Sequence, residues 1–279
     1  MARTIVLMVW LVVGVMAQVN VAVSIVPEAT FVRKIAGDLA KITVMVPPSA
    51  SPATYEPRPS QMKAIAKAQV YLAVGVPFER AWLPRFRAQN PRMKMVDITQ
   101  NIAKKPMRSH GSHAHGGQGG LDPHVWLSPP LVAQMARNIA KALSKIDPAH
   151  HSLFAANLAI FLKEIKALDE KLKKELAPCE GSAMMVFHPS WGYFARTYGL
   201  EQIPIEAEGK EPGPKLLAKL IRTAKEKRVK ALFVQPQFSK RTARLIAKHI
   251  DARLVEADPM AENWAQNLLR LAESICPKR

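Results

Sequence analysis

The longest periodic stretch of the chain, residues 148–176, reads PAHHSLFAANLAIFLKEIKALDEKLKKEL. Its large apolar side chains recur at steps of three and four residues, the spacing that gathers them on one face of an amphipathic helix. These positions are Phe154, Leu158, Phe161, Ile165, Leu168, Leu172 and Leu176. Pro178 then stops the helical pattern. We therefore predict a single long helix over this stretch.

On each side of this helix, short runs rich in β-branched residues alternate with helical segments. The composition, 48% hydrophobic and 22% charged, is that of a globular chain rather than a disordered one. Alternation of this kind is typical of parallel βαβ units. The predicted fold class is α/β, with two lobes that each contain a parallel sheet, joined by the long helix. The expected strands are 19–26, 42–46, 70–74 and 93–98 before the helix, and 184–187, 202–205, 231–234 and 252–256 after it.

The N-terminus has the pattern of a secretory signal peptide. Arg3 precedes an uncharged apolar run over 5–16, and Ala17 ends a segment suited to cleavage. The run is too short for a membrane-spanning helix, and no cysteine stands at the cleavage point. A buried N-terminal strand or helix is the alternative. We expect an exported, soluble protein without a lipid anchor, divided into a signal peptide (1–17), a first lobe (18–147), a linker helix (148–177) and a second lobe (178–279).

The formal charge of +18 raises the question of nucleic-acid binding. The basic residues, however, are spread along amphipathic helices, and in the linker helix they alternate with acidic ones. No aromatic stacking platform accompanies them. Export also separates the protein from nucleic acid. We therefore expect a solvated basic surface, which would still suit anionic lipid or an acidic partner.

The two cysteines, Cys179 and Cys276, lie far apart in the sequence. Without CxxC spacing they make a poor zinc site, whereas an oxidising compartment favours a disulfide. We predict a bridge, with two free thiols as the alternative.

Three of the eight histidines lie in a glycine-rich, low-complexity loop over 108–120: His110, His113 and His115. Imidazole is a ligand for zinc, copper and nickel, and histidine-rich tracts commonly bind metal. The alternative is a solvated loop without a role. The composition favours metal handling, of lower affinity than a site with fixed geometry.

Three further residues are candidate ligands. His124 lies in Asp122-Pro123-His124, where Asp122 can orient the ring and leave the other nitrogen for a metal. His188 and Asp258 each follow a predicted strand, and ligands of open α/β sheets gather at the carboxyl ends of strands. Each residue taken alone is equally compatible with a structural role. His150, His151 and His249 are expected on the surface of helices.

Several motifs together make the chain resemble the zinc- and manganese-binding substrate-binding proteins of ABC transporters, the cluster A-I family. Asp122-Pro123-His124-Val125-Trp126-Leu127-Ser128-Pro129 is the strongest of them. Ala36-Gly37-Asp38, Val46-Pro47-Pro48 and Ser51-Pro52-Ala53-Thr54-Tyr55-Glu56-Pro57 add to it in the first lobe. His188, Gly192-Tyr193-Phe194, Tyr198-Gly199 and residues 233–238 add to it in the second. The resemblance covers essentially the whole mature chain, and the histidine-rich loop is similar to that of the zinc members.

The resemblance implies that two lobes joined by a rigid helix hold a metal ion in the cleft between them. His124 and His188 match two histidine ligands of the family, and Asp258 matches a carboxylate ligand. Ala53 stands where the family has its first histidine and cannot ligate a metal. Three interpretations remain open: water completes the shell, His113 or His115 supplies the missing imidazole, or the cleft has lost tight zinc binding.

The function implied by the resemblance is capture of Zn²⁺ in the periplasm and delivery to an inner-membrane ABC permease, by a monomer that is not an enzyme. Mn²⁺ is the less suitable ion, because the manganese members lack the histidine-rich loop. A zinc hydrolase is a second hypothesis, with Glu56 or Glu206 as base, but no HExxH helix or serine-nucleophile elbow appears. A repurposed cleft is the third, for another divalent metal or for an adhesin or interaction protein.

Overall fold

The computed structural model describes residues 18–107, 120–206, 211–238 and 240–277. The predicted signal peptide and the three histidines of the glycine-rich loop lie outside these ranges. Within them, no helix is both long and apolar enough to cross a membrane.

Two four-stranded sheets, all of whose strand pairs are parallel, form the frame of the molecule. The first sheet has the order β2-β1-β3-β4 and the second has the order β6-β5-β7-β8. The first is built from β1 (Val19–Val23), β2 (Ala40–Val44), β3 (Val70–Ala73) and β4 (Lys94–Asp97). The second is built from β5 (Ala183–Val186), β6 (Glu201–Pro204), β7 (Ala231–Val234) and β8 (Arg253–Glu256). The α/β prediction is confirmed.

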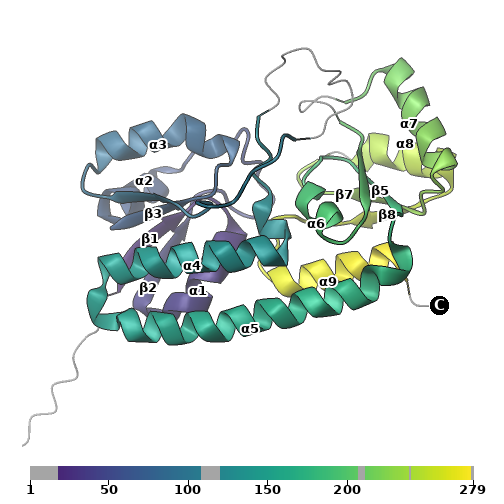
Figure 1. Cartoon of the computed structure of the whole chain (residues 1–279). Coiled ribbons are helices and arrows are strands. Elements are labelled where there is room, and N and C mark those ends of the chain that lie inside the picture. Colours follow the sequence, from purple (N-terminus) through teal and green to yellow (C-terminus); the bar gives the residue numbers. More distant parts are fainter. Residues whose placement is uncertain (1–17, 108–119, 207–210, 239, 278–279) are drawn as a thin grey trace, which may run out of the picture.

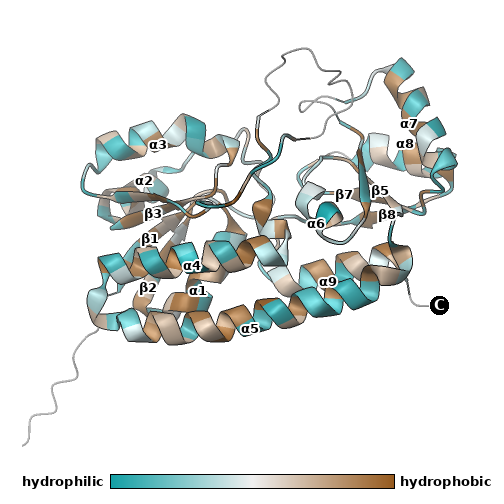
Figure 2. Cartoon of the chain, in the orientation of Figure 1, coloured by the Kyte–Doolittle hydropathy of each residue, from teal (hydrophilic) through white to brown (hydrophobic). Residues whose placement is uncertain are grey.

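The strand sequences explain this arrangement. The central strands β3 and β7 read VYLA and ALFV, and every residue in them is buried. Continuous apolar runs of this kind belong to parallel strands that are covered on both faces by helices. The covering helices are α1 (Val26–Ala36), α2 (Pro59–Lys67), α3 (Pro77–Gln89), α4 (Pro129–Ile146), α6 (Gly192–Thr197), α7 (Pro214–Glu226), α8 (Lys240–Ile250) and α9 (Trp264–Ile275). Their turns alternate between polar and apolar colours in Figure 2, as expected for helices with one buried face.

The predicted linker is helix α5 (His151–Leu176), which has 26 residues and follows a short 3₁₀ turn, η3 (Pro148–His150). At 1.5 Å per residue it is about 39 Å long. It runs under both halves of the molecule, packing on α1 and α4 on one side and on α9 on the other (Figure 1). Phe31 of α1 contacts Phe161 of α5 and the edge of Trp264 of α9, with ring centroids 5.9 and 5.2 Å apart. One cluster of buried apolar side chains therefore extends into both halves, and a second cluster is confined to the second half.

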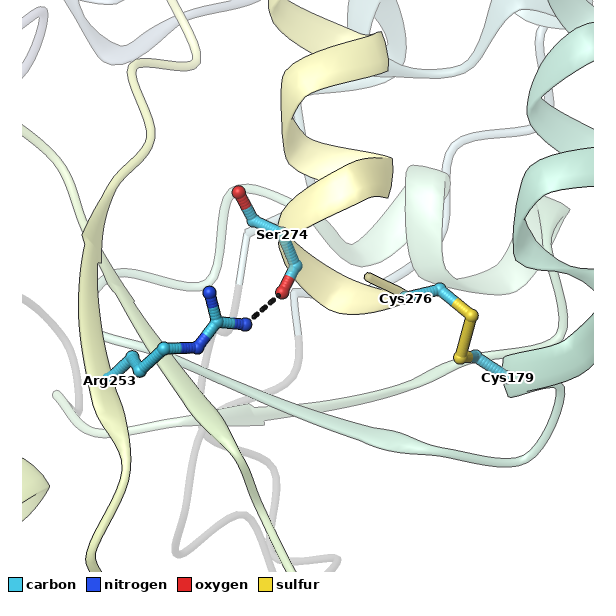
Figure 3. Close-up of a disulfide and its surroundings, with 4 residues drawn as sticks. All are labelled: Cys179, Arg253, Ser274 and Cys276. Carbon is cyan, nitrogen blue, oxygen red and sulfur yellow. Dashed lines mark hydrogen bonds between the residues drawn. A yellow bond between two sulfur atoms is a disulfide. The ribbon is translucent and has the colours of Figure 1, made fainter. Parts of the chain in front are cut away.

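Cys179 and Cys276 form a disulfide, as predicted, with their Cα atoms 5.9 Å apart. The bridge joins the 3₁₀ turn after α5, η4 (Ala177–Cys179), to the end of α9 (Figure 3). Next to it, Arg253 at the start of β8 donates a hydrogen bond to the Ser274 carbonyl of α9. The end of the chain is thereby fixed to both the long helix and the second sheet.

One local difference from the sequence prediction has a physical cause. β1 stops at Val23 rather than at residue 26, because α1 begins at Val26 with Pro27 in its first turn. Proline suits that position, and the Glu28 carboxylate accepts a hydrogen bond from the Ile25 amide.

Candidate metal centre

The carboxyl ends of the strands in both sheets border a cavity of about 810 Å³. β5 leads into His188, β6 into Glu206 and β7 into Gln235, while β3 leads into Gly75 on the opposite wall. Open parallel sheets place their ligand sites at this edge. The cavity is lined by Ser51, Pro52, Ala53, Thr54, Gly75, Val76, Pro77, Arg80, Met107, Gly120, Leu121, Pro123, His124, Trp126, His188, Pro189, Glu206, Gln235, Gln237, Phe238, Pro259 and Met260.

His124 immediately precedes the short 3₁₀ helix η2 (Val125–Leu127) and is held there by Asp122. Asp122 Oδ1 lies 2.7 Å from His124 Nδ1 and accepts a second hydrogen bond from the His124 amide at 3.0 Å. Burial lowers the pKa of His124, and the hydrogen bond to Asp122 opposes this shift. The ring is thus favoured as neutral imidazole, with Nδ1–H directed at the carboxylate and Nε2 carrying a lone pair.

His188 is held in the same way by a different carboxylate. Its Nδ1 lies 2.5 Å from Oε1 of Glu206, which is buried at the end of the neighbouring strand β6. Phe238 stacks on the ring, with centroids 5.3 Å apart. The His188 and His124 rings are themselves 5.4 Å apart between centroids. The two imidazoles therefore form an adjacent pair that borders the cavity, each with Nδ1 next to a carboxylate.

Helix α6 supports Asp122 from the second half of the chain. The Tyr193 hydroxyl donates to the Asp122 carbonyl at 3.1 Å and accepts from the Lys105 amide at 2.9 Å. Arg196 places its guanidinium 3.8 Å from Asp122 Oδ2 and lies over the Tyr193 ring. A Cβ atom at Gly192 would lie only 3.0 Å from Asp122 Oδ2, so glycine leaves room for the carboxylate. The segment that carries His124 is fixed by contacts with both halves.

Asp258 follows β8 as expected, but its carboxylate is turned to other partners. Oδ1 accepts hydrogen bonds from Gln237 Nε2 at 3.1 Å and from the Met260 amide at 2.9 Å. Its neighbours Pro259 and Met260 border the cavity. Within the described ranges, no group of three or more histidine, cysteine, aspartate or glutamate residues is close enough together to hold a metal ion. The structure thus brings together His124 and His188, with Ala53 on the same cavity and Asp258 set back from it.

The sequence correctly predicted that Asp122 orients the His124 ring. It did not connect Glu206 to His188, and it did not indicate that Arg80 borders the cavity. Glu206 is 18 residues from its partner, on the next strand, and only the adjacency of β5 and β6 brings the two together. The signal was present, because Glu206 follows a predicted strand as His188 and Asp258 do. Arg80 sits in an ordinary amphipathic helix, and nothing in the pattern of α3 marks it. His150 pairs with Asp147, and His249 bonds to the Leu245 carbonyl, as helix residues outside the cavity lining.

The sequence matches a known protein family over nearly its whole length. The family described as zinc-uptake complex component A, periplasmic (ZnuA), matches residues 21–275. The chain belongs to the ZnuA family. This confirms the resemblance seen in the sequence, and the family is one of periplasmic zinc-uptake components rather than of enzymes.

Solved ZnuA structures share the fold over most of its length. A crystal structure of ZnuA is 41% identical, covers 93% of this chain and 98% of its own, and superposes with a TM-score of 0.86. A ZnuA deletion mutant with zinc bound is 42% identical, covers 93% and 97%, and gives a TM-score of 0.85. The high-affinity zinc uptake system protein ZnuA of Paracoccus denitrificans is 31% identical over 201 residues, which cover 61% of each chain.

Proposed function

We propose that this protein captures zinc in the periplasm and delivers it to the permease of an ABC transporter in the inner membrane. The observation that carries the proposal is the facing pair of imidazoles, His124 and His188, with their Nδ1 atoms held by Asp122 and Glu206. Neither Nε2 has a hydrogen-bond partner among the described residues. A histidine oriented by a carboxylate through one nitrogen is the usual form of a histidine zinc ligand.

Zn²⁺ is the ion that this donor set fits best. Imidazole is a preferred zinc ligand, whereas manganese favours oxygen donors, so Mn²⁺ is the less suitable cargo. Glu206 Oε2 is buried and without a partner among the described residues, which leaves negative charge next to the pair. We propose Asp258 as a further ligand after its carboxylate turns from Gln237. The proposed role of His110, His113 and His115 is accessory, lower-affinity metal binding.

The remaining parts of the proposal concern location and organisation. Residues 1–17 act as a signal peptide, and the mature protein is a monomer in the periplasm without a lipid anchor. Its parts are a first lobe (18–147), a linker helix (148–177) and a second lobe (178–279). It binds no nucleic acid, and its partner is an inner-membrane permease. Membership of a periplasmic uptake family supports this location.

The test is calorimetric titration of Zn²⁺, and separately Mn²⁺, into metal-free mature protein. We expect a tight zinc phase that His124→Ala and His188→Ala each abolish. His249→Ala is the matched control, because that histidine is exposed on α8 and outside the cavity lining. Deletion of residues 109–120 should change the stoichiometry more than the tightest affinity. Parent-like zinc binding in both single variants would refute the assignment.

A further inference from the structure

The described side chains at the cavity offer few metal-ligating atoms for a metal ion that is bound without another ligand. Zinc in proteins is almost always bound by four ligands, and structural sites take all four from side chains. Here two imidazoles face the cavity, and Asp258, the nearest predicted addition, already accepts two hydrogen bonds. In the part of the chain that the structure describes, no third donor completes a cluster. Among the described residues, the two imidazoles, with Asp258 once its carboxylate turns, leave the shell incomplete, and a partner other than these side chains can fill the open position.

The size and lining of the cavity fit an organic molecule. Its volume of about 810 Å³ lies in the range of about 300–1,000 Å³ that is usual for small-molecule sites. A water molecule, by comparison, takes about 30 Å³, so an ion with two waters would fill a small part of the space. Apolar side chains line much of the cavity wall, among them Val76, Leu121, Phe238 and Met260.

Arg80 is the feature that indicates the charge of that molecule. Its side chain is exposed on α3 and borders the cavity beside Gly120. It has no hydrogen bond or ion pair with any described residue. A guanidinium on the wall of a cation site repels the cation, because like charges interact unfavourably at close range. The same group is the preferred protein partner of a carboxylate, which it binds through two parallel hydrogen bonds.

We propose that the cavity takes its metal as a complex with a small carboxylate chelator. The Nε2 atoms of His124 and His188 bind the ion from one side, and the chelator supplies the remaining donors from the other. A carboxylate of the chelator pairs with Arg80, and its carbon skeleton contacts the apolar wall. Free amino acids such as histidine and hydroxycarboxylates such as citrate share this chemistry. The inference rests on the proposed zinc-binding function and specifies the form in which zinc is bound.

Equilibrium dialysis with isotopically labelled chelators tests the proposal directly. Mature protein is dialysed against labelled L-histidine or labelled citrate, each with and without Zn²⁺. We expect one of the two to be retained only when zinc is present, and the retained one identifies the class. His188→Ala should abolish retention, because the chelator is held through the metal. Retention without zinc, or no retention of either molecule by protein that binds zinc tightly, would overturn the inference.

Two substitutions separate this inference from its alternatives. Arg80→Gln should weaken retention of the chelator about tenfold, the effect expected from loss of one charge-assisted pair, without weakening zinc binding in chelator-free buffer. Arg87→Gln, an exposed change on the same helix, is the charge-matched control and should have no effect. Equal retention by the Arg80 and Arg87 variants would overturn the role of Arg80.

Ala53→His tests the donor count. Ala53 borders the cavity, so a histidine there should raise affinity for chelator-free zinc and reduce chelator retention by competing for the open coordination positions. If the substitution changed neither zinc affinity nor chelator retention, the chelator would not occupy the open coordination positions. Unchanged zinc binding in His124→Ala and His188→Ala would instead refute the proposed function, so the two failures can be told apart.

Discussion

Replacing Cys179 and Cys276 by serine removes a bridge between residues 97 positions apart. In the loop-closure model, opening a loop of that length restores chain entropy worth about 4.7 kcal/mol to the unfolded state. For a protein of this size each kcal/mol lowers the melting temperature by about 2 °C, so we expect a loss of about 9 °C. The bridge lies at the ends of α5 and α9, and neither cysteine borders the cavity. Zinc affinity should therefore stay at the parental level.

The assays are thermal unfolding, which measures the melting temperature, and denaturant unfolding of the parent, of Cys179→Ser and of the double serine variant. Both variants should unfold at the same denaturant concentration, below the parent, because either one removes the bridge. In reducing agent, the parent should unfold at the same lower denaturant concentration as the two variants. A double variant within about 1 kcal/mol of an oxidised parent would refute the loop-closure reasoning. It would mean that the packing of α9 on α5 already restricts this loop in the unfolded ensemble.

Two further predictions concern buried carboxylates. Asp122→Asn and Glu206→Gln should each lower zinc affinity about 10- to 100-fold, because a neutral amide replaces the charged carboxylate that orients each ligand ring. Zinc titration measures this, and Glu256→Gln, exposed on β8, is the control. Parental affinity in both variants would show that packing alone orients the rings. Burial, with the nearby Glu79, raises the pKa of Glu28 well above its ordinary value of 4.5. The native state then binds more protons than the unfolded state, so the stability contribution of Glu28 falls as pH rises above about 4.5. Glu28→Gln should flatten the decline in unfolding free energy as pH rises above about 4.5, whereas the exposed control Glu170→Gln should keep the parental slope. A parental slope in Glu28→Gln would contradict this account.

The sequence predicted the fold well because its strongest signals are local. β-branched runs identified the strands, and the three- and four-residue spacing of the long helix identified α5. Element ends were less certain: β-branched residues recur throughout 19–26, on both sides of the end of β1, so this pattern alone does not separate β1 from α1. Pro27 marks the boundary only once a helix is known to begin there.

The candidate site was predictable only in part. Asp122 and His124 are two residues apart, so their contact is a local one. The link between His188 and Glu206 depends on strand order, which the sequence does not specify. The orientation of Asp258 depends on Gln237 and Met260, which lie on separate segments. Arg80 lies on α3 in the first half of the chain, whereas His188 lies in the second half. No local pattern predicts that Arg80 borders the cavity.

Helix α9 has a consequence for the order in which the molecule can be made. Trp264 packs against Phe31, and its indole N–H donates to the Trp126 carbonyl at 2.7 Å. Both partners lie in the part of the chain that leaves the ribosome first. The first half therefore lacks part of its core until nearly the whole polypeptide has been synthesised. Its final packing must follow translation rather than accompany it, and a nascent chain stalled before Trp264 would keep apolar surface exposed.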